Sequence, residues 1–232
     1  MSGQLRMNPA TAVRIAIIVA IIAFCCTCSI GPLAGGGTDV DNGKITGHIV
    51  YANDGNPAYN ARIILMKINA DPVACGAAAC SLYIAATDSA GHYGISGLAY
   101  RLYRLVAISA DSQFFALRCS VAVAGPSIVN LGADTIRRPG AARISLPDSG
   151  IDSGGYFYIP GTTISWTIDS AAIISGELYA ALMPAGRPIP FLVYKNFAAP
   201  AKFAVGSEII AAEGDTIDIS FDFGDTLDPG DD

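Results

Sequence analysis

The chain contains only two histidines, His48 and His92, and histidine is the side chain most often used for metal binding and proton transfer. His48 lies in a run of alternating apolar residues, and His92 directly follows a turn-like Asp-Ser-Ala-Gly stretch. A histidine that stands alone in a strand-like run is a surface or core residue far more often than a metal ligand. The sequence therefore predicts no metal site.

Four carboxylates are the candidates for acid–base chemistry: Asp88, Asp111, Asp169 and Glu177. A glycoside hydrolase needs two such groups about 5–10 Å apart in a cleft. Most of these four follow turn patterns, in which an aspartate accepts backbone hydrogen bonds. The sequence also lacks a Gly-x-Ser-x-Gly elbow, a Walker A loop and a dinucleotide-binding glycine pattern. We therefore predict that the protein is not an enzyme and has no catalytic or cofactor-binding residue.

Cys75 and Cys80 enclose four residues within a loop-like segment. In an oxidising compartment this pair can form a disulfide, because a hairpin loop allows the Cα separation of up to about 7 Å that the bond requires. Such a disulfide would constrain the loop and would take no part in redox chemistry. Cys119, the third cysteine of this part of the chain, would be left over, either buried or unpaired.

The N-terminal segment has the features of an export signal. Arg6 and Arg14 precede an apolar run over 15–24, and a basic start followed by about ten apolar residues is typical of a signal-peptide core. The run is shorter than the ~18–20 residues that cross a bilayer as a helix. An uncleaved signal anchor is the alternative, because residues 10–13 and the cysteines after the run lengthen the apolar segment.

Three cysteines, Cys25, Cys26 and Cys28, close this run and precede a glycine-rich stretch. Their order resembles a bacterial lipoprotein signal, in which an acylated cysteine is followed by a flexible polar tether. The resemblance implies acylation of Cys28, with Cys26 as the alternative. It also implies an exported protein anchored by lipid in the bacterial cell envelope, at the outer membrane or cell surface. Residues 1–28 would then be the signal and residues 29–43 the flexible tether.

The remaining chain has the pattern of β structure. Short runs of strand-forming residues recur after residue 44, each ended by turn residues, whereas helical periodicity is weak. In the first run, Ile45, Gly47 and Ile49 share one face. Apolar residues make up 52% of the sequence, which is enough for sizeable cores. A net charge of -6 without clustered bases argues against a nucleic-acid surface. We predict an all-β fold.

Residues 44–133 contain a series of short motifs: Ile45-Thr-Gly-His-Ile-Val followed by Asn56-Pro-Ala-Tyr-Asn-Ala-Arg-Ile-Ile-Leu, then Thr87-Asp-Ser-Ala-Gly-His-Tyr, Tyr103-Arg-Leu-Val-Ala and Val129-Asn-Leu-Gly. In this order they resemble the carboxypeptidase regulatory-like domain, which is a transthyretin-like β-sandwich. The resemblance implies a Greek-key sandwich, transthyretin-like or Ig-like, whose motifs record turns and core positions. The turn at 88–91 fits this expectation, because Asp88 can accept backbone hydrogen bonds and Gly91 can take the positive φ of a hairpin.

Residues 134–219 form a second, degenerate β-module in this interpretation, smaller than the first. The two modules end alike, since residues 127–136 and 208–217 both finish in Asp-Thr-Ile, and this likeness indicates a duplication. The stretch 137–140, Arg-Arg-Pro-Gly, is the expected junction. Residues 220–232 are rich in aspartate, so we predict a disordered acidic tail.

The second module is rich in aromatic residues, and we expect most of them in the core. Trp166 is the candidate for stacking on a ligand such as a sugar ring. The predicted function is that of a non-catalytic, envelope-anchored lipoprotein whose sandwiches serve structural, adhesive or protein-interaction roles. The alternative is a carbohydrate-binding module protein associated with polysaccharide degradation. The predicted partners are the membrane, through the lipid anchor, and a protein or a polysaccharide.

Overall fold

The computed structural model describes residues 42–74, 80, 82–146, 151, 154–186, 189, 192–195, 202–204 and 212–220. All of these residues belong to one compact unit, 39–232, and everything below concerns that unit. Cys25, Cys26, Cys28 and Cys75 lie outside the described residues, as do the predicted signal and most of the predicted tether and tail. Within the described ranges, no helix is long and apolar enough to span a bilayer.

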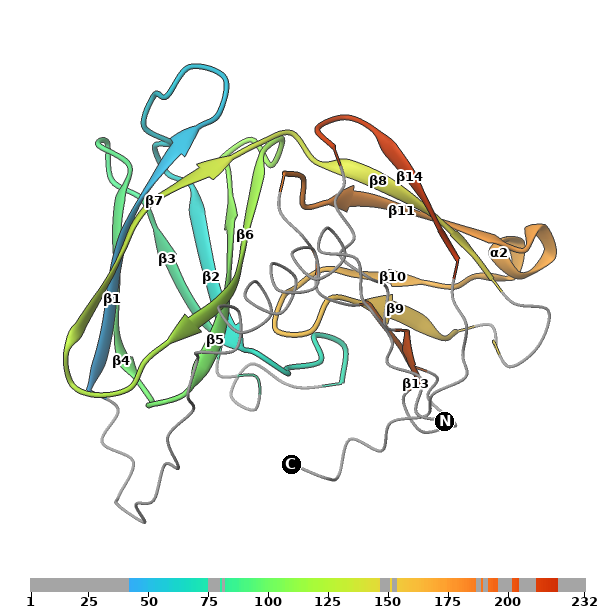
Figure 1. The fold of residues 1–232 in the computed structure, drawn as a ribbon, viewed down its shortest axis with the longest axis horizontal. Helices are drawn as coiled ribbons and strands as arrows, with labels where there is room; N and C mark the ends of the chain where they lie inside the picture. The colour runs from blue at the N-terminus through green and yellow to red at the C-terminus, as the bar shows by residue number, and fades with distance from the viewer. Residues whose placement is uncertain are drawn as a thin grey trace, which may run out of the picture. The chain divides into compact units, whose positions relative to one another are not determined.

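The first half of the described chain is a sandwich of two sheets (Figure 1). In one sheet, β1 lies between an antiparallel partner, β4, and a parallel partner, β7. The other sheet is antiparallel and has the order β3-β2-β5-β6. The strands are β1 (Gly43–Tyr51), β2 (Arg62–Lys67), β3 (Tyr83–Ala86), β4 (His92–Leu98), β5 (Leu102–Ile108), β6 (Phe115–Ala122) and β7 (Ile128–Ile136).

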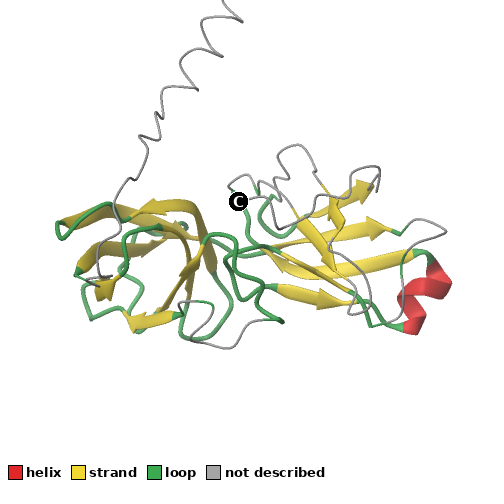
Figure 2. Ribbon diagram, turned by 90° about the horizontal axis from the view of Figure 1, so that it is seen from below, coloured by secondary structure: helices red, strands yellow, loops and turns green. Residues whose placement is uncertain are grey.

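The second half repeats this arrangement strand for strand. One sheet has the order β11-β8-β14, with β8 antiparallel to β11 and parallel to β14, and the other has the order β10-β9-β12-β13. A short helix, α2 (Ser170–Ser175), lies at the end of this sandwich (Figure 2). The strands are β8 (Gly140–Ser145), β9 (Tyr156–Tyr158), β10 (Ser165–Thr167), β11 (Glu177–Met183), β12 (Leu192–Lys195), β13 (Lys202–Ala204) and β14 (Thr216–Ser220). The prediction of an all-β fold built from sandwiches is confirmed.

The two sandwiches have the same topology, but the sequence match at their ends does not align equivalent positions. Thr135 pairs with Val50 near the end of β7, whereas Thr216 pairs with Ala141 at the start of β14. The common strand order therefore points to duplication more clearly than the shared Asp-Thr-Ile does.

The central strands β2 and β5 of the sheet β3-β2-β5-β6 are buried on both faces, whereas the edge strand β3 has one exposed face. Along β2, Ile63 and Leu65 join the core of the first sandwich, whereas Ile64 and Met66 join a core cluster that contains most of the buried residues of the second. Strand β5 divides in the same way. Two-sided burial explains why β2 and β5 are continuous apolar runs, while β1 alternates buried and partly exposed residues. The first sandwich thus packs against the second through this sheet.

Candidate functional site

The contact between the two sandwiches contains a buried arginine and a carboxylate that accepts hydrogen bonds from both sandwiches. We call this contact the junction, and define it by Asp71, Arg104, Tyr156, Pro160, Gly161 and Lys195. Asp71 and Arg104 belong to the first sandwich, and the other four belong to the second.

Arg104 is a cation buried at the centre of this contact. It lies on the face of β5 that points to the second sandwich, and only 2% of its surface is exposed. Its Nε donates a 3.2 Å hydrogen bond to the carbonyl of Cys119, and its Nη1 donates to the carbonyl of Pro160. Burial lowers the pKa of Arg104, but a guanidinium keeps its charge in a protein. Arg104 therefore ties β5 and β6 to the turn between β9 and β10.

That turn fits closely against the chain that leaves β2. Gly161 has a φ of +68°, and its N–H donates a 2.7 Å hydrogen bond to the carbonyl of Ala70. A Cβ at this position would lie 2.6 Å from the carbonyl oxygen of Ile68. Both the backbone conformation and the close approach thus require glycine. Thr162 closes the turn, since its buried hydroxyl donates to the carbonyl of Ile159 at 2.7 Å.

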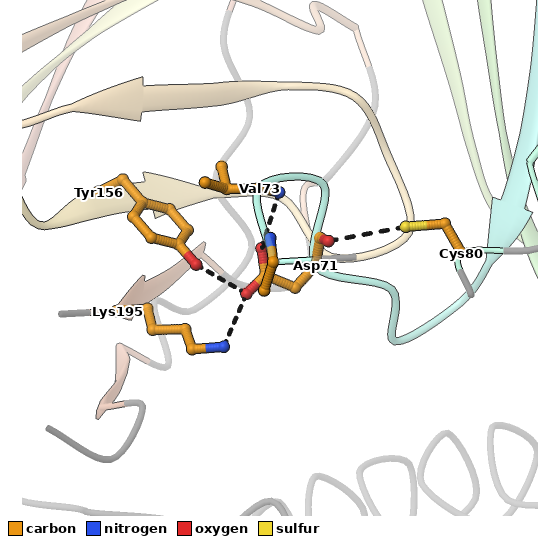
Figure 3. Close-up of polar contacts among 6 residues, drawn as sticks. Asp71, Val73, Cys80, Tyr156 and Lys195 are labelled. Atoms are coloured by element: carbon orange, nitrogen blue, oxygen red, sulfur yellow. Dashed lines mark hydrogen bonds and ion pairs between the residues drawn. The ribbon is translucent and has the colours of Figure 1, made fainter. Parts of the chain in front are cut away.

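Asp71 accepts hydrogen bonds from both sandwiches (Figure 3). Its Oδ2 accepts from the hydroxyl of Tyr156 on β9 at 2.8 Å and from Nζ of Lys195 on β12 at 3.0 Å. Its Oδ1 accepts from the backbone N–H groups of Val73 and Ala74 at 3.0 and 3.1 Å. One carboxylate thus fixes its own loop and holds two strands of the second sandwich.

The charges at Asp71 follow from these contacts. Burial by itself raises the pKa of the carboxyl, but the hydrogen bonds from Lys195, Tyr156 and the two backbone N–H groups outweigh it, so the pKa of Asp71 is lowered. Burial and the hydrogen bond to Asp71 raise the pKa of Tyr156. The carboxylate stays ionised and the phenol stays neutral near neutral pH. A hydrogen-bonded carboxylate and a protonated tyrosine are poor proton acceptors, so this arrangement acts as a structural clamp.

Asp71→Asn is expected to lower the free energy of unfolding by about 1.5–3 kcal/mol at pH 7, because hydrogen bonds to a charged group contribute about that much. Urea unfolding followed by circular dichroism measures the difference. The control is Asp218→Asn, whose side chain is 76% exposed and should change stability by less than about 0.5 kcal/mol.

The same variant has a defined pH dependence. The pKa of Asp71 is lower in the folded protein than in the unfolded chain, so its contribution is fully present above the ordinary carboxyl pKa of about 3.9. That contribution is lost as the pH falls through the lower folded pKa. The stability difference between wild type and Asp71→Asn should therefore be constant at neutral pH and shrink in acid. A difference that is unchanged at pH 3 would contradict the clamp.

Cys80 is disulfide-bonded, and its sulfur lies 3.7 Å from the carbonyl oxygen of Asp71. The predicted partner, Cys75, lies outside the described residues, so the Cys75–Cys80 pairing stays a prediction. Cys119 is half-buried on β6, and its carbonyl accepts the hydrogen bond from Arg104. Cys80, the last residue of the predicted disulfide loop, therefore lies next to the junction, which the sequence did not indicate.

An ion pair with a buried carboxylate lies inside the first sandwich. Nε of Arg118 on β6 is 2.8 Å from Oδ2 of Asp134 on β7, and Asp134 is almost fully buried. Among the described residues, the hydroxyl of Tyr93 is buried nearby without a hydrogen-bond partner. Burial, with Asp134 as a second cause, raises the pKa of Tyr93. This group joins the two sheets across the core.

The four candidate carboxylates do not come together. Oδ1 of Asp88 accepts from the N–H groups of Ala90 and His92, and Asp111 accepts from the N–H of Gln113. Asp169 caps the first turn of α2 by accepting from the N–H of Ala172. Glu177 lies on an exposed sheet face, 3.8 Å from Arg143. Three of the four therefore act in turns or caps, as their sequence context predicted, and the fourth is solvated.

Most of the described aromatic residues of the second sandwich lie in its core. Tyr156, Tyr158 and Tyr194 are buried. Trp166 is half-buried against the core, and its Nε1 donates a 2.8 Å hydrogen bond to the carbonyl of Ala181. Tyr179 is instead the exposed aromatic ring, with 61% of its surface accessible. The geometry at Trp166 is thus that of a packed side chain more than that of a stacking platform.

Sequence reasoning missed the residues of the junction. Asp71 and Lys195 stand 124 residues apart, so no local pattern connects them. Arg104 did carry a usable feature, because it is the single charge within the apolar run of β5. A charge inside a run that is buried on both faces requires a polar partner from another element.

No family model and no curated protein matches the chain. Among solved structures, the Bacillus anthracis TIE protein is 16% identical over 77% of this chain, with a TM-score of 0.30, and this chain spans 33% of it. A streptococcal ancillary pilin is 13% identical over 77% of this chain and 63% of its own, with a TM-score of 0.31. A minor pilin of Streptococcus agalactiae is 12% identical over 77% of this chain and 94% of its own, with a TM-score of 0.28.

Proposed function

We propose that this protein is a non-catalytic lipoprotein of the bacterial cell envelope, in which two joined β-sandwiches serve a structural or adhesive role by contacting a protein partner. The observation that carries the proposal is the junction. A buried cation, a shared carboxylate and a turn fitted against backbone join the two sandwiches. Two joined sandwiches on a tether suit a protein that presents surface loops at a distance from the membrane.

The first sandwich is proposed to be a carboxypeptidase regulatory-like domain. Its hairpin at 88–91 has the features that the motif implied, since Asp88 accepts two backbone hydrogen bonds and Gly91 has a φ of +78°. Tyr93 and Tyr103 fill the core from opposite sheets, with 5% and 0% of their surface exposed. These are structural roles, which agrees with a module that presents surfaces and does not catalyse a reaction.

Mass spectrometry of the N-terminus, taken from native membranes, tests the anchoring. The expected result for the wild type is a chain that begins at Cys28 and carries acyl groups. The Cys28→Ala variant should remain unprocessed or appear in the soluble fraction. Cys26→Ala is the matched control and should leave processing unchanged. A chain that retains Met1 without an acyl group would overturn the lipoprotein assignment and favour an uncleaved anchor.

Photo-crosslinking in intact cells tests the interaction role. A crosslinking amino acid is placed at Tyr59, which is 65% exposed in the first sandwich, or at Tyr179 in the second. The expected result is a discrete protein adduct from at least one of these positions, and none from the buried position Phe157. Absence of any adduct, together with retention of the protein on an insoluble polysaccharide, would establish the carbohydrate-binding alternative instead.

A further inference from the structure

Both histidines of the chain meet on the outer face of the first sandwich. His48 on β1 and His92 on β4 are directly paired in the antiparallel register. Their ring centroids are 4.7 Å apart, with an angle of 35° between the ring planes. The fold thus brings into contact the two histidines of the chain, which lie far apart in the sequence.

The surroundings leave this pair accessible. The two rings border a hollow of about 500 Å³, which is also lined by Thr46, Asn130 and Ala133. In the described part of the chain, no side chain or backbone group makes a hydrogen bond to either imidazole ring, and the two rings contact each other. The ring nitrogens are therefore not engaged by hydrogen bonds from the described residues.

The backbone holds the two rings in place. His92 follows a hairpin whose Asp88 accepts a hydrogen bond from the N–H of His92 at 2.9 Å. The ring of His48 lies over Gly91, where a Cβ would be only 3.0 Å from Nε2 of His48. Because residue 91 is a glycine, there is space above it for the imidazole ring of His48. Two side chains on paired strands are thus positioned before any ligand arrives, which lowers the entropy cost of binding.

The separation of the rings suits two ligands of one metal ion. A histidine nitrogen binds Zn²⁺ at about 2.0–2.1 Å, which places the ring centre about 3 Å from the metal. Two rings about one ion are then about 4.5–5 Å apart between centres, and the observed 4.7 Å falls in that interval. Among the described residues, no third His, Cys, Asp or Glu joins the pair, so the remaining positions are open to water or to a donor from another molecule.

We propose that His48 and His92 together bind one divalent transition-metal ion of the kind that favours imidazole, such as Zn²⁺, Ni²⁺ or Cu²⁺. Hard cations such as Mg²⁺ and Ca²⁺ prefer oxygen ligands and are not expected to bind here. The site is independent of the proposed envelope function, because it rests on the outer face of the sheet and not on the junction.

Titration calorimetry with Ni²⁺ tests the site on the full-length chain, with its thiols alkylated so that cysteines do not compete. The variants are His48→Gln, His92→Gln and the double variant, and Thr46→Ala is the control because it lines the same hollow and keeps both imidazoles. Wild type should bind one ion per chain. Each single variant should bind Ni²⁺ at least tenfold more weakly than the wild type. The double variant should bind only slightly more weakly than a single variant, because removal of the first histidine already abolishes chelation.

Two results would overturn the proposal. In the first, the wild type binds two ions per chain and each single variant binds one ion with unchanged affinity. This result would mean that each histidine is a separate monodentate site. The other is unchanged binding in all variants. Nitrogen NMR of the wild-type imidazoles during a Zn²⁺ titration gives a readout that does not depend on the folding of any variant. Both histidines should shift together, and a shift of only one would equally refute a shared site.

Discussion

Gly161→Ala is expected to lower the free energy of unfolding by about 2–5 kcal/mol. The alanine would have to adopt a φ of +68°, which costs about 1–2 kcal/mol for a residue with a Cβ. Its Cβ would also lie 2.6 Å from the carbonyl oxygen of Ile68 and 2.9 Å from that of Lys67, and both atoms belong to backbone that cannot rotate away. Overpacking of this kind costs about 1–3 kcal/mol.

Gly132→Ala is the matched control, because Gly132 has the same φ of +68° but no atom within 4 Å of its Cβ position. The Gly132→Ala variant should lower the free energy of unfolding only by the cost of the positive φ. Urea unfolding measures both variants, and the fluorescence of Trp166, the single tryptophan, reports on the strand that follows the Gly161 turn. Equal losses in the two variants would mean that the turn does not press on the backbone of the first sandwich.

Arg104→Ala should be at least as damaging, with an expected loss of about 3–5 kcal/mol. Truncation leaves the carbonyls of Cys119 and Pro160 buried without their donor, and each unpaired group costs about 1–3 kcal/mol. It also leaves a cavity between packed sheets. Arg104→Met fills most of that cavity but restores no hydrogen bond, so an intermediate loss of about 2–4 kcal/mol is expected.

Arg62→Ala on β2 is the control for Arg104, because it removes the same side chain from an exposed position and should change stability by less than about 0.5 kcal/mol. The double variant Arg104→Ala with Gly161→Ala gives a further check. Both changes loosen the same contact between the turn and the first sandwich, so their combined cost should be smaller than the sum. Strict additivity would show that the two residues stabilise the protein independently and that the junction is not one unit.

The residues of individual strands and turns were predictable because their constraints are local. The alternation that places Ile45 and Ile49 on one face of β1 follows from the period of two in a strand, and both are fully buried. The hairpin at Asp88 and Gly91 was predictable for the same reason. Helix α2 was missed, because its six residues are too few for periodicity to show, although Asp169 and Gly176 cap its two ends.

The sequence by itself determined that this chain folds into β-sandwiches, since burial of alternate side chains is encoded residue by residue along each strand. Only the tertiary structure decided which strands meet. It brought Asp71 to Tyr156 and Lys195, placed Arg104 under the Pro160 turn, and paired His48 with His92. The physical reason is that these contacts join segments far apart in the chain, and their partners are selected by the packing of whole sheets, which no local pattern specifies.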